Sequence, residues 1–197
     1  MSQHTEVSDV KLLAWNICDG FSDMQRAEGI VNIIEDQQPD VAFFSEAYKE
    51  GDEEHLEAVL DRFRILGYAA LHEYYNDDDG RRDRHGLLAI SRVGGLAVQR
   101  MRSRNGAHIV AHDEETGSSI NIYGVHLDDR RERGRLWQTH TLREQIENTE
   151  SKNENIIMGD FNAMHGDDSR ARLFRRLKSI WELVPSVEPG TPKKVMP

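Results

Sequence analysis

The feature that most constrains the fold of this chain is a short segment that is apolar at both alternating positions. Residues 10–16 read Val-Lys-Leu-Leu-Ala-Trp-Asn, with apolar side chains at even and at odd positions. A strand with one face in water alternates apolar and polar residues, so this pattern indicates a strand covered on both faces. Residues 41–45, Val-Ala-Phe-Phe-Ser, predict a second buried strand. Such strands favour a layered α/β or α+β domain.

Amphipathic segments between the apolar runs predict the helices. Residues 22–37 have apolar side chains at helical spacing, Ser22 and Gln25 form a candidate capping box, and Pro39 marks the stop. The order of the remaining elements mixes helices with hairpin-like neighbouring strands. Further helices are predicted at 53–63, 131–148 and 168–179, strands at 68–75, 87–91, 96–102, 107–112, 119–126 and 155–159, a loop at 76–84 and a hairpin turn at 113–117.

The length of 197 residues fits one domain. We expect residues 1–9 to be a flexible lead-in, residues 10–184 to form the domain, and residues 185–197 to be an irregular tail. No apolar run approaches the ~20 residues that span a bilayer, and the first nine residues lack a signal-peptide pattern. Cys18 is the only cysteine, which excludes an intramolecular disulfide and suits a reducing compartment. We therefore expect a cytoplasmic location.

The formal net charge of -10 argues against broad, sequence-independent binding of nucleic acid, which requires a basic surface. It does not exclude a nuclease, because bound Mg²⁺ and local arginines can offset the charge of a substrate. Arginines are dense near residues 81–84, 130–135 and 170–176. Solvated helix faces and loops are the commoner explanation for such runs.

Polar side chains follow four of the predicted strands. They are Asn16, Glu46, His126, and Asp160 with Asn162. Strand ends are where α/β sheets collect ligand and catalytic groups. Carboxylate oxygens suit Mg²⁺, a second carboxylate can orient or deprotonate water, and histidine or asparagine can stabilise charge on a phosphoryl oxygen.

Each of these residues also has an ordinary explanation when it is taken alone. Asn16 could end a strand in a turn, and Glu46 could be the first exposed residue after a buried strand. His126 shares the parity of Ile120 and Ile122, as a hydrogen-bonded core histidine would. Asp160 could open an Asx turn. The order and local context of the four positions favour a common site.

These motifs, taken in order, resemble those of the endonuclease/exonuclease/phosphatase (DNase I-like) superfamily. The similar stretches are Trp-Asn, Ser-Glu, Gly-Val-His-Leu-Asp and Gly-Asp-Phe-Asn-Ala, supported by residues 85–92 and 135–138. The resemblance implies a four-layer αββα sandwich, in which two packed mixed β-sheets are flanked by helices and the site lies at one end. Members of the superfamily cleave phosphoester bonds, usually with Mg²⁺ or Mn²⁺.

The resemblance also implies roles for individual residues. Glu46 would be the principal metal ligand, and Asn16 would support the metal or the phosphate. His126 would contact the scissile phosphate. Asp160 would orient or activate the attacking water, and Asn162 would position Asp160 and the phosphate.

Four further residues are candidates for supporting the site or binding substrate. Some related nucleases carry an aspartate two residues after the first-strand asparagine. This chain has Cys18 at that place and Asp19 one residue later, so Asp19 is one of the candidates. The others are Asp128, Arg84 and Arg135.

The superfamily pattern continues with an Asp-bearing strand and a terminal Ser-Asp-His motif, and no Ser-Asp-His occurs in this sequence. We therefore expect the last strands of the fold to be missing. Three explanations stay open: a fragment of a longer hydrolase, a natural short form with weak or no activity, or replacement of the histidine by His140 or His165. Missing strands would expose a sheet edge and favour self-association through it.

The sequence thus predicts a divalent-metal-dependent phosphoester hydrolase of the nuclease, phosphodiesterase or phosphatase type, using in-line attack of water. The alternative is a catalytically silent phosphate-binding module or a truncated fragment of such a hydrolase. Nucleic acid, a small phosphodiester and a phospholipid headgroup all remain open as substrates. The sequence does not determine the oligomeric state.

Overall fold

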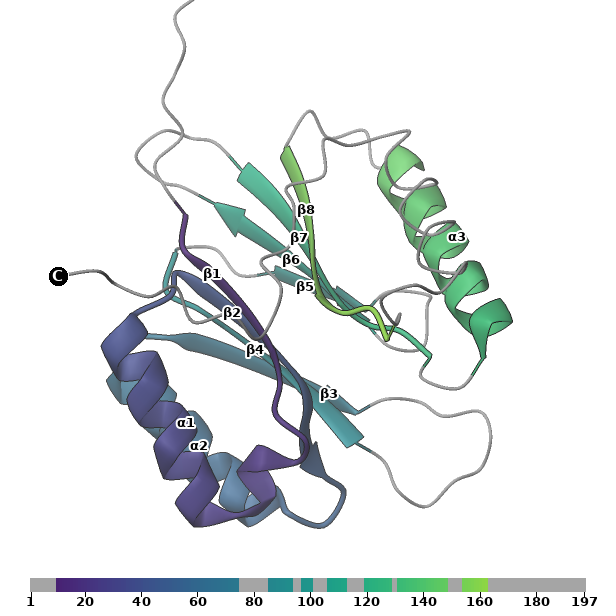
Figure 1. Cartoon of the computed structure of the whole chain (residues 1–197). Helices are drawn as coiled ribbons and strands as arrows, with labels where there is room; N and C mark the ends of the chain where they lie inside the picture. Colours follow the sequence, from purple (N-terminus) through teal and green to yellow (C-terminus); the bar gives the residue numbers. More distant parts are fainter. Residues whose placement is uncertain are drawn as a thin grey trace, which may run out of the picture. The chain divides into compact units, whose positions relative to one another are not determined.

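Two four-stranded β-sheets organise the chain in its computed structural model (Figure 1). The first sheet has the order β1-β2-β4-β3 and the second β5-β6-β7-β8. Pairs β1–β2 and β7–β8 are parallel and the other neighbours are antiparallel, so both sheets are mixed. The strands are β1 (Leu12–Asn16), β2 (Val41–Lys49), β3 (Ala69–Tyr74), β4 (His85–Ser91), β5 (Ala97–Arg100), β6 (Gly106–His112), β7 (Ser119–His126) and β8 (Glu154–Asp160).

Helices cover the outer faces of both sheets. Helices α1 (Met24–Gln37) and α2 (Glu53–Ile65), with the short 3-10 turn η1 (Gly20–Ser22), pack against the first sheet through one apolar cluster. In Figure 1, α3 (Glu132–Asn148) lies on the side of the second sheet that faces away from the first. The four-layer αββα sandwich implied by the sequence motifs is therefore confirmed. None of the helices in the described part of the chain is long and apolar enough to cross a membrane.

Two apolar layers hold the sandwich together. The outer layer contains an aromatic group in which the Phe21 ring meets Phe44 and Phe63 edge-on, at centroid distances of 5.5 and 6.0 Å. The inner layer, between the sheets, includes Phe43 from β2 and Ile122 from β7, both fully buried. Buried side chains on both faces of β2 explain why this strand is apolar at odd and even positions.

The start of α1 differs from the prediction. Ser22 ends η1, and its hydroxyl accepts a hydrogen bond from the Lys49 backbone at 3.2 Å. Asp23 caps the helix instead, accepting from the Arg26 backbone N–H at 2.8 Å. The Ser22–Gln25 capping box was therefore wrong, because a tertiary contact uses the serine hydroxyl and the next residue offers a carboxylate.

Strand β2 is longer than predicted and is interrupted by a bulge. We expected it to end at Ser45, yet it continues to Lys49. Phe44 pairs with Leu88, and the next pair is Tyr48 with Gly86, so extra residues of β2 lie between the two pairs. Glu46 therefore lies inside the strand, at the bulge, and not beyond its end.

The structure describes residues 10–74, 85–93, 97–100, 106–112, 119–128, 131–148 and 154–162. The predicted lead-in 1–9, loop 76–84 with Arg84, turn 113–117, helix 168–179, His165 and tail 185–197 lie outside these ranges. The domain limits at residues 10 and 184 therefore stay predictions, as does self-association through a sheet edge.

Candidate active site

Two parallel strand pairs bring the predicted site residues to one end of the sandwich. Asn16, the last residue of β1, pairs with Ser45, so Glu46 follows directly on the neighbouring strand. In the second sheet, His126 at the end of β7 pairs with Asp160 at the end of β8. Because parallel strands run in one direction, their carboxyl ends lie at the same end of the sheet. These ends of the two sheets meet, since Asn16 contacts Asp160 across the sheets.

The Asn16 amide joins the two carboxylates. Its Nδ2 donates to Glu46 Oε1 at 3.0 Å and to Asp160 Oδ2 at 2.9 Å. Its Oδ1 accepts from the Cys18 backbone N–H at 3.0 Å, which fixes the orientation of the amide. Two carboxylates that share one neutral donor concentrate negative charge at this position, which favours a bound cation.

Backbone strain places Glu46. Its φ of 47° lies in the left-handed region, which costs a non-glycine residue of order 1–3 kcal/mol. Bulges are frequent beside active sites because they redirect a side chain. The Glu46 carbonyl accepts a hydrogen bond of 2.6 Å from the Asp19 backbone, which helps to hold this conformation.

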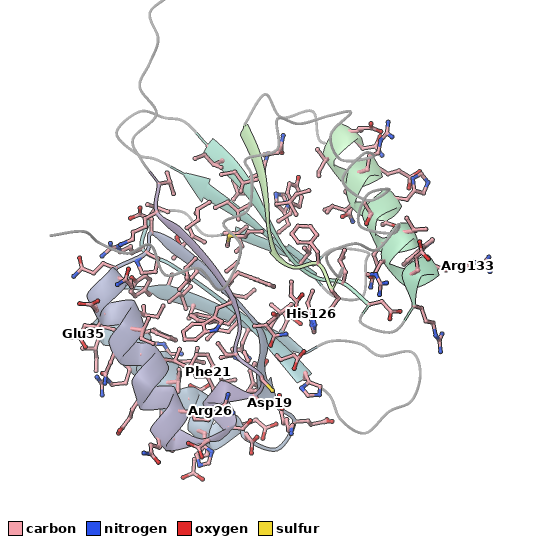
Figure 2. The ribbon with its side chains drawn as sticks, in the orientation of Figure 1. Asp19, Phe21, Arg26, Glu35, His126 and Arg133 are labelled. Atoms are coloured by element: carbon pink, nitrogen blue, oxygen red, sulfur yellow. The ribbon has the colours of Figure 1, made fainter. Side chains whose placement is uncertain are left out.

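His126 faces the first sheet from the end of β7. It shares the parity of Ile122, which packs between the sheets. Its Nε2 lies 3.4 Å from Glu46 Oε1, and the two side chains are 13% and 27% exposed. His126, labelled in Figure 2, therefore combines the predicted core-facing parity with a position next to the Glu46 carboxylate.

The last residues of β8 and the Asx turn after them place Asp160. Gly159, with φ of 132°, lies against the Val125 carbonyl, where any Cβ would overlap the backbone oxygen. Asp160 Oδ1 accepts from the Asn162 backbone N–H at 2.9 Å, so the Asx turn exists, and Oδ2 still reaches Asn16. Asn162 Nδ2 donates to the carbonyl of Leu127, the residue directly after β7, at 2.7 Å, which connects the turn to the end of that strand.

Two of the supporting candidates brace the loop after β7. Arg135 is only 8% exposed, and its Nη1 donates to the Asp128 carbonyl at 2.8 Å. Asp128 Oδ1 accepts from the Arg131 backbone, and its own N–H donates to Gln138 Oε1. Arg135 is thus buried against the loop, while Arg84 lies outside the described residues. His140 is 60% exposed on α3 and lies 3.5 Å from Glu144 of the same helix.

Asp19 makes contacts that the sequence did not predict. Its carboxylate accepts from His85 Nδ1 at 2.7 Å and pairs with Lys49 Nζ at 3.0 Å. His85 belongs to the family-like stretch at residues 85–92, which contains β4. The sequence of that stretch does not predict a contact between His85 and Asp19. That pairing depends on the register of β4 against the bulged β2.

The oxygen donors of the site suit a hard divalent cation, although they are few. Within the described ranges, no three His, Cys, Asp or Glu side chains are grouped so that they could hold a metal ion. Glu46 and Asp160 offer carboxylate oxygens of the type that Mg²⁺ prefers. Mg²⁺ commonly keeps several waters and binds through one or two carboxylates plus substrate phosphate, so this pair fits it.

Solved structures share this fold. The human Nocturnin catalytic domain with bound sulfate anion has a TM-score of 0.64 at 16% identity, covering 83% of this chain and 67% of that one. Truncated Caenorhabditis elegans TDP2 has a TM-score of 0.55 at 16% identity, covering 79% and 63%. Bacteroides thetaiotaomicron mannosyl-6-phosphatase has a TM-score of 0.61 at 13% identity, covering 84% and 69%. The chain spans about two thirds of the length of these structures.

Sequence comparison gives the family. No curated protein matches the chain significantly. The sequence profile of the Endonuclease/Exonuclease/phosphatase family matches residues 13–193. This range includes all the site residues described above and every strand and helix, apart from Leu12 at the start of β1. The chain belongs to the Endonuclease/Exonuclease/phosphatase family.

Proposed function

We propose that this chain hydrolyses phosphoester bonds with the help of a divalent cation, Mg²⁺ or Mn²⁺. The observation that supports this most directly is the Asn16 amide, which donates to Glu46 and Asp160 from opposite sheets at 3.0 and 2.9 Å. His126 lies beside this pair, 3.4 Å from Glu46. A structural role alone does not require two carboxylates and a histidine at the same end of the sandwich.

In this proposal Glu46 is the principal metal ligand. A bound cation would polarise a phosphoryl oxygen and offset the charge that develops on it. Asn16 keeps the two carboxylates together by donating to both. Because its Oδ1 already accepts from the Cys18 backbone, we assign Asn16 to positioning the carboxylates.

The remaining residues act on water and phosphate. Asp160 accepts a proton from a water whose oxygen forms the new bond to phosphorus, in line with the ester oxygen that leaves. The leaving oxygen takes its proton from solvent. His126 donates a hydrogen bond to a phosphoryl oxygen and stabilises its charge in the transition state. Asn162 holds the Asp160 turn through its contact with Leu127.

The net charge and the names of similar proteins support a proposed class of substrate. The net charge of -10 disfavours long duplex nucleic acid, whose binding requires basic surface. Nocturnin's catalytic domain was solved with a sulfate anion, and the Bacteroides protein is a mannosyl-6-phosphatase. We therefore propose small phosphoesters, nucleic-acid ends or phospholipid headgroups as substrates.

Hydrolysis assays on the full chain test this proposal. An aryl phosphodiester and a labelled DNA oligonucleotide would be incubated with Mg²⁺, Mn²⁺ or EDTA. We expect metal-dependent turnover in the wild type and a loss of at least ~100-fold in Glu46→Gln, the scale at which removal of a preorganised charge acts in catalysis. Glu35→Gln is the matched control, because Glu35 is exposed on α1 and points away from the sheets in Figure 2.

Equal turnover in Glu46→Gln and wild type would contradict the assignment of Glu46. Folded wild-type protein that binds phosphate and hydrolyses neither substrate would favour the silent phosphate-binding module instead. The two outcomes are separated by circular dichroism of each variant and by titration with inorganic phosphate.

A further inference from the structure

Asp19 connects the loop after β1 to both strands that frame the Glu46 bulge. Its backbone N–H donates to the Glu46 carbonyl at 2.6 Å. Its carboxylate, on a side chain that is 15% exposed, lies 3.0 Å from Lys49 Nζ and 2.7 Å from His85 Nδ1. Asp19 thus contacts the backbone of Glu46 and one side chain on each of β2 and β4.

The positions of Lys49 and His85 give these contacts their significance. The two residues are register partners, Lys49 on β2 and His85 on β4, just past the bulge. Regular pairing resumes there, after the irregularity that contains Glu46. The Asp19 carboxylate therefore contacts the residue pair at which regular pairing of β2 and β4 has resumed. Its backbone N–H donates to Glu46, which lies in the bulge.

The loop that carries Asp19 is itself strained. Cys18 and Asp19 are consecutive left-handed residues, with φ of 47° and 56°. Such conformations persist only when surrounding contacts over-determine them. The Asp19 carboxylate contacts Lys49 and His85, whereas the Asn16 amide donates to Glu46 and Asp160.

We propose that Asp19, with His85 and Lys49, is a positioning unit that fixes the Glu46 carboxylate in the geometry required for metal binding. This inference rests on the proposed function, in which Glu46 is the metal ligand. The unit acts through the backbone, because the carboxylate anchors Asp19 and the Asp19 N–H anchors Glu46. Neither His85 nor Lys49 touches the metal in this proposal.

Direct ligation by Asp19 would give the opposite prediction for its two partners. If the Asp19 carboxylate itself bound the metal, Lys49 and His85 would compete for its oxygens, and their removal would tighten metal binding or leave it unchanged. If Asp19 positions Glu46, removal of either partner loosens the unit and weakens metal binding. The sign of the effect in His85→Gln and Lys49→Met therefore separates the two roles.

The test is Mn²⁺ binding to the full chain, measured by the electron paramagnetic resonance signal of free Mn²⁺. Wild type, Glu46→Gln, Asp19→Ala, His85→Gln and Lys49→Met would be compared, with Glu35→Gln as control and circular dichroism to verify folding. We expect Glu46→Gln to lose binding. Asp19→Ala and His85→Gln should each weaken it about 10-fold or more, the usual effect of removing a residue that orients a ligand. Lys49→Met should weaken it in the same direction, and Glu35→Gln should match wild type.

Different failures have different meanings. Wild-type affinity in Asp19→Ala and His85→Gln, with binding lost in Glu46→Gln, would overturn the positioning unit and leave the proposed function standing. Tighter binding in His85→Gln and Lys49→Met would also overturn it, by making Asp19 a ligand. No Mn²⁺ binding by the wild type, or equal binding by Glu46→Gln, would remove the proposed function and the positioning role together. Should Asp19→Ala fail to fold, His85→Gln and Lys49→Met decide the matter.

Discussion

Backbone strain concentrates at the site residues. Among described non-glycine residues, positive φ occurs at Cys18, Asp19, Gln38, Glu46 and Asn162. Gln38 is the ordinary left-handed end of α1, whereas the other four belong to the site or to the loop beside it. Strained residues cluster at functional positions because the surrounding contacts compensate for their cost. The distribution of strain therefore agrees with the proposed site.

Gly159→Ala tests the end of β8 that places Asp160. A Cβ at Gly159 would overlap the Val125 carbonyl oxygen, and φ of 132° is strained for any side chain. We expect a loss of at least ~1–3 kcal/mol in the free energy of unfolding and a strong loss of turnover. Gly29→Ala in α1 is the control, since nothing lies within 4 Å of its Cβ position. The Gly29→Ala substitution should leave the free energy of unfolding unchanged or raise it by about 0.5–1 kcal/mol. Equal stability of the two variants would contradict the strain assigned to a side chain at position 159.

At the scale of elements, strands β6, β7 and β8 share a polar group on the outer face of their sheet. His108 stacks on Tyr123 with ring centroids 4.5 Å apart and an interplanar angle of 4°. Its Nε2 lies 3.2 Å from Asn121 Oδ1, and Asn121 Nδ2 donates to Asn155 at 3.0 Å. Burial lowers the pKa of His108 from its ordinary value of 6.5, and the hydrogen bond to Asn121 opposes this only in part.

This pKa shift predicts the direction of a pH dependence. Above pH 6.5, His108 is largely neutral in the folded and the unfolded chain. Below it, the unfolded chain takes up a proton that the folded chain resists, so stability falls as pH drops toward the lower, folded-state pKa. The slope is at most ~1.4 kcal/mol per pH unit within that window. His108→Gln keeps a donor for Asn121 but cannot titrate, and urea unfolding between pH 5 and pH 7 should show a flatter dependence.

His140→Gln is the control for this experiment. The His140 side chain is 60% exposed on α3 and pairs only at 3.5 Å with Glu144. His140→Gln makes the same histidine-to-glutamine change on an exposed helix face, so it reports the effect of the substitution itself. If His108→Gln keeps the pH dependence of the wild type, burial of His108 does not contribute to the acid sensitivity of the fold.

At the scale of the whole molecule, the site requires the two sheets to approach closely. Asn16 and Asp160 come from different sheets and are 144 positions apart, yet their side chains meet at 2.9 Å. Gly124 on β7 permits this approach, because its missing side chain leaves room for the fully buried Phe43 ring of β2. Packing between the sheets and geometry at the site are therefore linked.

Gly124→Ala tests this link. Its Cβ would overlap the Phe43 ring, so we expect overpacking to cost about 1–3 kcal/mol in urea unfolding and to reduce turnover by separating the sheets. In the double variant Gly124→Ala/Phe43→Leu, the smaller side chain makes room for the added methyl group. The combined loss of stability should then be smaller than the sum of the single losses. Strictly additive losses would show that these two residues do not set the sheet spacing.

Local pattern was sufficient for the elements and for the family. Periodicity predicted each described strand and helix, with shifts at their ends, because alternation and helical spacing are properties of neighbouring residues. The positions of Asn16, His126 and Asp160 at the ends of their strands were predicted for the same reason. The ordered motifs also indicated the family, which the profile match over residues 13–193 confirmed.

The tertiary structure alone decided how these residues meet. The bulge at Glu46 depends on the register between β2 and β4, and the role of Asp23 as the cap of α1 depends on Lys49 occupying the Ser22 hydroxyl. The contact of His85 with Asp19, and that of Asn16 with Asp160, join segments separated by 66 and 144 positions. Periodicity reports which face of an element is buried. It carries no information on the offset between paired strands or the distance between packed sheets, and those two quantities set the geometry of this site.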